Sequence, residues 1–325
     1  MEIQVLTELV EHLRILLSGV FGFQTLSSEI FLFRPFVLLV VLGVAGGLVS
    51  VIVNLHQLEF NAETTVHAIF PGIVAGAVFW GIEAINAGAV VVGVCVTAAL
   101  TWNSWRKTAA SARAAGHAGS EAGTAVILTS FFSVGVVLSL KKGDMSGQLE
   151  ALMFGRLLEV TDSRMAQSVL ACIVAVVLLA LTWRRQVFVA FDRDGAKAAG
   201  VNMLLIDLVA NVAITAVVIA GSSAVGTLLV IGYLIVPGAT GKILARSVRG
   251  MCLIAVGMGV VGGYIGMVLM NVQSSHPISP QGAVALSVVG IFFVALIIKR
   301  LCARIQEAVA KKRPQISSPV SEKVA

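Results

Sequence analysis

The sequence predicts an all-α membrane protein, a polytopic bundle of about nine transmembrane helices. Its 325 residues are 58% hydrophobic and only 12% charged, and the mean hydropathy is +0.96. Soluble domains carry about a quarter charged residues, so this composition indicates a membrane protein. The chain also holds 32 glycines but only four tryptophans and two tyrosines. Small residues let helices approach closely in lipid, which agrees with a tightly packed bundle.

Nine segments are long and apolar enough to cross a bilayer, which takes roughly 17–25 residues of helix. The segment 8–23 is also apolar, but it carries Glu8, Glu11, His12 and Arg14, so we expect it to lie in the membrane interface. The nine predicted spans are 36–53, 64–82, 86–102, 122–140, 166–183, 203–220, 224–245, 251–271 and 282–299.

The distribution of lysine and arginine predicts the orientation. With nine spans and the N-terminus outside, inside segments carry 17 of these residues and outside segments carry six. Positive charge concentrates in cytoplasmic loops, so the prediction is N-out and C-in. The predicted parts are an extracytoplasmic or interfacial segment 1–35, a transmembrane domain 36–300, and a cytoplasmic, disordered tail 301–325.

Composition and motifs argue against several functions. The net charge of +6 follows the membrane ends and forms no nucleic-acid footprint. The four cysteines make no CxxC pair. The stretch VPGATGK, 236–242, lacks the first glycine of a phosphate-binding loop, and Ile243 follows its lysine. An enzyme is therefore not expected, and ATP hydrolysis would belong to another chain.

The strongest candidate site lies in the stretch ETTVHAIFPG, 63–72. Glu63 and His67 are four residues apart, so they share one helix face. A carboxylate and an imidazole together suit manganese, iron or zinc. His56 and Glu59 are predicted to extend the same face. The alternative is that Glu63 and His67 only form hydrogen bonds between helices.

A second candidate pair, Asp207 and Asn211, offers oxygen ligands at the same spacing. The alternative interpretation, which we favour, is a polar clamp between helices. Pro71-Gly72 and Pro237-Gly238 are predicted to interrupt two spans. Interrupted membrane helices often line a transport pathway, although a static kink is an equal alternative.

The inside loop 184–202 contains FDRDGAKAAGVN, which is rich in small residues. A short helix of this kind can dock into a groove of a partner, whereas a solvated loop is the ordinary explanation.

Four stretches together resemble one family, the membrane permease of manganese, zinc and iron ABC importers. ETTVHAIFPG resembles the family's D-A-L-S-H-A-x-L-P-G. FDRDGAKAAGV resembles F-D-x-E-x-A-x-x-x-G-V. SAVGTLLVIGYLIVPGATGKIL, 223–244, and PQGA, 280–283, match two further motifs in the same order. The sequence departs from the pattern at Glu63, where the family has aspartate, and at Gly238 and Gly241, where it has alanine.

The resemblance implies a permease without a permanent cofactor, which passes a divalent metal ion. It implies a second permease copy, cytoplasmic ATP-binding subunits and an extracytoplasmic metal-binding protein as partners, in the plasma membrane of a prokaryote. By this resemblance, Glu63 and His67 fall on the family's aspartate and histidine, which implies that they contact the cation in the pathway. The segment that would couple to the ATPase carries Phe191, Asp192, Arg193, Ala196 and Gly200.

Two other functions stay open from the sequence. One is a permease for a larger metal chelate such as a siderophore or cobalamin. The other is a secondary carrier driven by an ion gradient, which needs no ATPase.

Overall fold

The computed structural model describes residues 2–19, 30–81, 84–110, 118–140, 155, 157–222, 225–270 and 279–312. Within these ranges the regular structure is helical. The helices are α1 (Glu2–Ser18), α3 (Ile30–His56), α4 (Glu59–Ala68), α5 (Phe70–Trp80), α6 (Ile85–Ala110), α7 (Ala118–Leu140), the 3-10 turn η2 (Leu157–Glu159), α9 (Asp162–Phe191), α10 (Arg193–Ala198), α11 (Met203–Ser222), α12 (Thr227–Leu244), α13 (Val248–Met270) and α14 (Pro280–Lys312).

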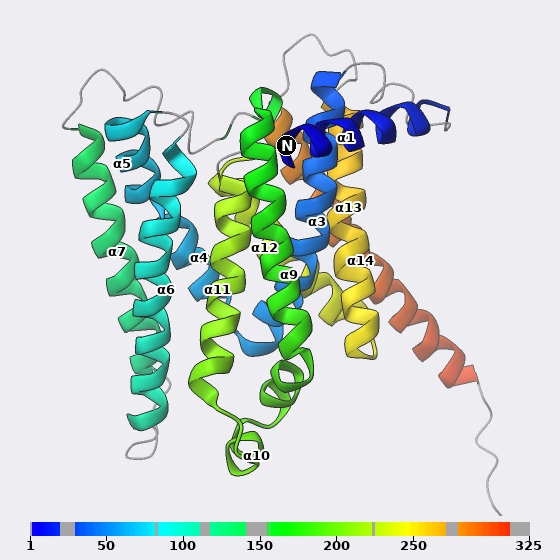
Figure 1. Ribbon diagram of the computed structural model, residues 1–325. Helices are drawn as coiled ribbons and strands as arrows, with labels where there is room; N and C mark the ends of the chain where they lie inside the picture. The colour runs from blue at the N-terminus through cyan, green and yellow to red at the C-terminus, as the bar shows by residue number, and fades with distance from the viewer. Residues whose placement is uncertain are drawn as a thin grey trace, which may run out of the picture.

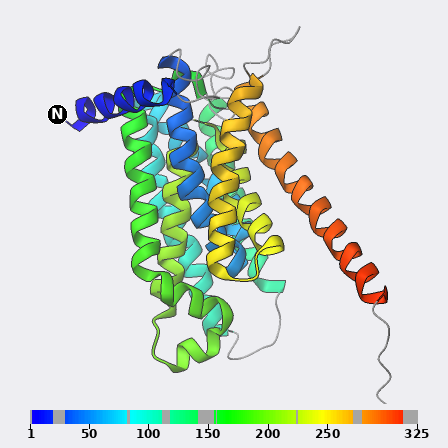
Figure 2. The same ribbon diagram turned by 90° about the vertical axis from the view of Figure 1, so that its right-hand side faces the viewer.

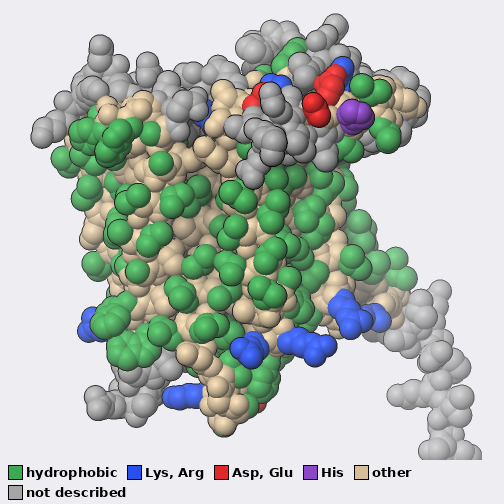
Figure 3. All heavy atoms as spheres, in the orientation of Figure 1, with side chains coloured by type: hydrophobic (Ala, Val, Ile, Leu, Met, Phe, Trp, Pro, Cys, Tyr) green, Lys and Arg blue, Asp and Glu red, His purple; other side chains and the backbone are tan. Residues whose placement is uncertain are grey.

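Nine candidate spans lie in this described part of the chain, which confirms the predicted fold class and span count. Each coincides in order with a predicted segment, and α4 and α5 together form the second span. Figure 1 shows the spans side by side, with α1 lying across one end of the bundle and α10 projecting from the other. Apolar side chains cover the flank of the bundle, and lysine and arginine side chains gather toward the α10 end (Figure 3).

Exposed aromatic side chains lie toward both ends of the spans. Phe79 and Trp80 end α5, and Trp102 and Trp105 lie in the last part of α6, which runs in the opposite direction. Tryptophan concentrates at membrane–water interfaces. The positions of these two pairs therefore agree with one aromatic belt at each interface. The ends of the bundle are thus distinct, while the assignment of the α10 end to the cytoplasm stays a prediction.

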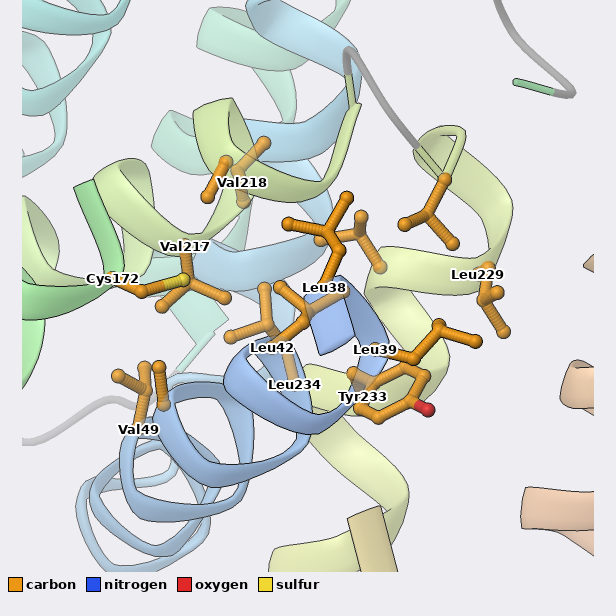
Figure 4. Packing of buried hydrophobic residues seen from close by; sticks show 14 of the residues in the cluster. Leu38, Leu39, Leu42, Val49, Cys172, Val217, Val218, Leu229, Tyr233 and Leu234 are labelled. Atoms are coloured by element: carbon orange, nitrogen blue, oxygen red, sulfur yellow. The ribbon is translucent and has the colours of Figure 1, made fainter. Parts of the chain in front are cut away.

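The core is built around α3, which packs against α13, α12, α9 and α11. Leucines of α3 meet valines of α11 and the Tyr233 and Leu234 side chains of α12 in one buried cluster (Figure 4). The helix carries no charged residue between Arg34 and His56, and a helix that is apolar all round is buried. Its sequence therefore explains its central place.

Glycines form close helix contacts, as the glycine-rich composition predicts. Gly43 on α3 and Gly259 on α13 face each other, so a Cβ added to Gly259 would lie 2.6 Å from the Gly43 carbonyl oxygen. Gly72 and Gly88 pack α5 against α6 in the same way, with a Cβ on Gly72 placed 2.3 Å from the Gly88 oxygen. Backbone therefore touches backbone at both crossings.

We expect Gly259→Ala to destabilise the chain by about 1–3 kcal/mol, the usual cost of overpacking, because backbone atoms must move. Gly257→Ala is the matched control. Gly257 lies on the same helix, α13, and a Cβ added there would meet no atom within 4 Å. Thermal unfolding in detergent measures both. Equal melting temperatures for the two variants would contradict the tight α3–α13 crossing.

Two predicted boundaries are wrong. Residues 184–191 do not form a loop, because α9 continues to Phe191. Residues 301–312 are not disordered, because α14 continues to Lys312 and its far half leaves the bundle (Figure 2). The rest of the predicted tail and most of the 20–29 and 141–156 segments lie outside the described residues. Charged residues ended the predicted spans too early, because helices extend beyond the hydrocarbon into water.

The N-terminal helix α1 packs against α3 and α9 through the buried Val10. Its polar face carries Glu11 and Arg14, which form an ion pair. The hydrogen bond from Arg14 is the main reason that the pKa of Glu11 lies below its usual value. One apolar and one charged face are typical of a helix lying on a membrane surface, as the sequence predicts for this segment.

Candidate site on the uncovered face of α4

A sharp turn separates α3 from α4. Gln57 adopts a left-handed conformation with φ 57°, and α4 begins at Glu59. The prediction that His56 extends the helix face of Glu63 is therefore wrong, because His56 ends the preceding helix. A ring nitrogen of His56, Nε2, lies 3.0 Å from the carbonyl oxygen of Gln186 on α9. The turn carries no glycine or proline, so no residue type in the sequence indicates it.

Glu63 and His67 lie on the face of α4 that the described residues leave least covered. The Glu63 side chain is exposed and His67 is partly buried, whereas the intervening Thr64, Thr65 and Val66 are buried. His67 makes an edge-to-face contact with Phe132 of α7, with ring centroids 5.9 Å apart. Glu59 begins the same helix and is partly buried. The predicted pair thus shares one face, directed away from the core.

The depth of this face suits an intramembrane site. Figure 1 shows α4 near mid-height of the bundle, above the lower ends of α6 and α7. The rise of about 1.5 Å per residue puts His67 roughly 6 Å further along α4 than Glu63. Within the described residues, no three histidine, cysteine, aspartate or glutamate side chains form a group able to hold a metal ion. The face therefore offers two neighbouring donors and leaves the remaining coordination to other groups.

The helix interruption predicted at Pro71-Gly72 is present. α4 ends at Ala68, and α5 begins at Phe70. Both Pro71 and Gly72 are buried, and Gly135 of α7 packs directly onto Pro71. Proline lacks an amide hydrogen, which removes the helical bond to the carbonyl of residue 67. The break falls at Ile69, two residues after His67, and it positions the α4 face relative to α5.

The interruption predicted at Pro237-Gly238 is wrong, because α12 runs unbroken from Thr227 to Leu244. Side chains of α3 satisfy its backbone: Ser50 Oγ accepts a bond from the Gly238 amide at 2.7 Å, and Asn54 Nδ2 donates to the Ile235 oxygen at 3.0 Å. Pro237 and Gly238 are buried. The sequence shows the proline but not the two polar partners that keep the helix continuous.

Asp207 and Asn211 do not join the Glu63 and His67 face. Asp207 forms an ion pair with Arg193, with 2.7 Å between Oδ2 and Nη2. Asn211 donates from Nδ2 to Thr101 Oγ1 at 3.1 Å and accepts at Oδ1 from Asn61 Nδ2 at 3.4 Å. The structure therefore shows both residues in polar contacts between helices, which was the favoured alternative.

The segment predicted to couple to a partner forms the short helix α10. Asp192 caps it, accepting a bond from the Gly195 amide at 2.8 Å. Ala196 is fully buried against Val189 and Ile206, and Gly200 ends the helix with φ 80°. These contacts fix α10 at the end of the bundle (Figure 1).

The outer side of this segment carries an apolar anchor. Phe191 is 71% exposed where α9 ends, and Asp192 and Arg193 beside it are also exposed. Phe191 is the last residue of the candidate span Asp162–Phe191, so its side chain lies at the end of that span, next to α10.

Sequence reasoning missed Asn61, Thr101 and Thr124. Thr124 Oγ1 donates to Asn61 Oδ1 at 3.5 Å, so α4, α6, α7 and α11 meet in one buried polar cluster. The available signal was a set of polar residues inside apolar spans, including Asn61 two residues before Glu63. Their pairing could not be read from spacing, because they lie far apart in the chain.

A helix bundle that presents ionisable side chains within a span is typical of membrane transport proteins. The chain belongs to the ABC 3 transport family, whose model matches residues 28–299.

Relatives in several bacteria cover most of the chain. It is 24% identical over 267 residues to the manganese transport system membrane protein MntC of Listeria monocytogenes, which covers 82% of this chain and 90% of that protein. It is also 24% identical over 283 residues to the chelated iron transport system membrane protein YfeC of Yersinia pestis, which covers 86% of this chain and 91% of that one.

The fold is shared with a solved structure. PsaBC from Streptococcus pneumoniae in complex with Fab gives a TM-score of 0.69 at 21% identity, covering 84% of this chain and 94% of the other. The likeness shows that the helices of the two chains have a common arrangement.

Proposed function

We propose that this chain is the membrane permease of an ATP-driven importer of divalent transition-metal ions, with manganese or zinc first and iron as a further candidate. The observation that carries the proposal is the uncovered face of α4, where Glu63 and His67 lie one turn apart within a span. Oxygen and nitrogen donors together suit these metals. The manganese and iron systems named for two relatives point to the same substrate class.

The exposed carboxylate also supports a second permease copy. A charged side chain facing hydrocarbon is costly, so Glu63 requires a polar surface or water opposite it. A second copy placed against this face would enclose a pathway and add its own donors to those of Glu63 and His67. Two donors from each copy give a site that binds an ion and still releases it.

The projection around α10 supports cytoplasmic ATP-binding subunits as partners. Phe191 supplies an apolar anchor, and the capped, buried base of α10 transmits force to α9 and α11. ATP binding in those subunits would move α10, and the two permease copies would rock about the pathway. The chain itself performs no hydrolysis in this proposal, and a metal-binding protein would deliver the ion from outside a prokaryotic plasma membrane.

Metal content of cells tests this proposal. In a strain deleted for the gene, we expect the wild-type chain to restore the cellular content of manganese, zinc or iron when the free ion is supplied. Uptake restored only by a siderophore or cobalamin complex would support a chelate permease instead. Uptake that persists without the partner ATPase would support a gradient-driven carrier. No restored metal at all would refute the importer.

A further inference from the structure

A line of polar side chains connects α10 to α4 through the interior of the chain. Arg193 on α10 pairs with Asp207 on α11, whose side chain is 10% exposed. One turn further along α11, Asn211 accepts a hydrogen bond from Asn61. Asn61 lies on α4, two residues before Glu63. The ion pair at the end of the bundle is therefore joined to the helix that carries Glu63 and His67.

Each of the two asparagines has a hydrogen-bond partner for both its amide oxygen and its amide nitrogen. Asn211 uses its oxygen toward Asn61 and its nitrogen toward Thr101, and Asn61 uses its nitrogen toward Asn211 and its oxygen toward Thr124. Both asparagines are at least nine-tenths buried. Truncating one leaves buried polar groups without partners, which is costly. The contact is specific to these amides.

The strengths of the links differ along the line. The Arg193–Asp207 pair joins two charges at 2.7 Å, and hydrogen bonds between charged groups are the strong ones. The two bonds that Asn61 makes to Asn211 and Thr124 measure 3.4 and 3.5 Å, which is at the weak limit. A displacement of α10 would therefore carry α11 with it, and the contacts of α4 would be the first to exchange.

The base of α11 is also tied to the rest of the bundle. Gln186 Nε2 donates to the Ile206 carbonyl at 3.1 Å, and the Gln186 carbonyl lies against His56 at the end of α3. Movement of α10 therefore also reaches α11 through α9, at Ile206, the residue before Asp207. Both routes meet where α11 begins, one turn before Asn211.

We propose that Asp207, Asn211 and Asn61 are positioning residues. They transmit movement of α10 to the uncovered face of α4, which carries Glu63 and His67. This inference rests on the proposed function, because it assigns the movement of α10 to the ATPase cycle. When the Asn61 hydrogen bonds exchange partners, Glu63 and His67 change position. Release of the ion is thereby coupled to the ATPase cycle.

The test uses the assembled importer in lipid vesicles and measures Mn²⁺ ions imported per ATP hydrolysed. We expect Asn61→Ala and Asp207→Asn each to lower this ratio about tenfold while ATP hydrolysis continues. The double variant should be no worse than the stronger single variant, because residues in one network are not additive. Exchanging the charges, Arg193→Asp with Asp207→Arg, should recover much of the ratio.

Thr215→Val is the matched control. Thr215 lies on α11, one turn beyond Asn211. Its hydroxyl forms a buried hydrogen bond of 2.7 Å with Thr97 of α6, and this bond does not involve α4. We expect its ratio to equal that of the wild type. An unchanged ratio in Asn61→Ala, with only a lowered melting temperature, would overturn the transmission and leave the importer standing. A wild-type complex that imports no metal would overturn the proposed function itself.

Discussion

Replacing Glu63 by glutamine is expected to lower manganese uptake about tenfold or more, the scale on which lost metal-site contacts act. Glutamine keeps the size of the side chain but removes the charge that attracts a divalent ion. The Glu63 side chain is exposed on α4, so the variant should fold and insert normally. Uptake by cells with equal amounts of each variant in the membrane measures the effect, and His67→Ala should reproduce it.

Glu121→Gln provides the control for this prediction. Glu121 is likewise an exposed glutamate, but it belongs to the first turn of α7 and not to α4. We expect it to transport at the wild-type rate. If Glu63→Gln and Glu121→Gln transport equally well, Glu63 does not contact the ion, and the pathway must be sought on another face of the chain.

Replacing Phe191 by alanine is expected to weaken binding of the ATP-binding subunits about tenfold or more. Large aromatic side chains dominate the binding energy of interfaces, with losses of about 2 kcal/mol or more when they are truncated. Phe191 is 71% exposed, so its removal should leave the permease itself stable. Co-purification of the subunits and the ATP hydrolysis of the complex measure the loss.

Leu181→Ala is the comparison for Phe191. Leu181 is 79% exposed on the same helix, ten residues before Phe191, which is the last residue of the candidate span. A lipid-facing leucine should not affect the subunits. Equal co-purification with both variants would show that the subunits bind another part of the α10 end.

The spans could be predicted because the bilayer imposes one length and one composition on each. Glu63 and His67 could be placed on one face because helix spacing alone decides it. The separation of His56 from that face could not be predicted, because the turn at Gln57 depends on how α3 and α4 pack. The same holds for Pro237, whose helix stays intact through Ser50 and Asn54, residues nearly two hundred positions away.

The last helix has a consequence for the membrane in which the chain works. The span within α14 covers 27 residues, Pro280–Gln306, or roughly 40 Å at 1.5 Å per residue, against a hydrocarbon core of about 30 Å. Such a helix is longer than the hydrocarbon core, and Figure 2 shows it inclined away from its neighbours. The exposed Lys299, Arg300 and Arg304 near its end reach the headgroups at a depth that depends on this tilt. A thinner bilayer therefore favours a larger inclination of α14, so the position of this helix depends on lipid chain length.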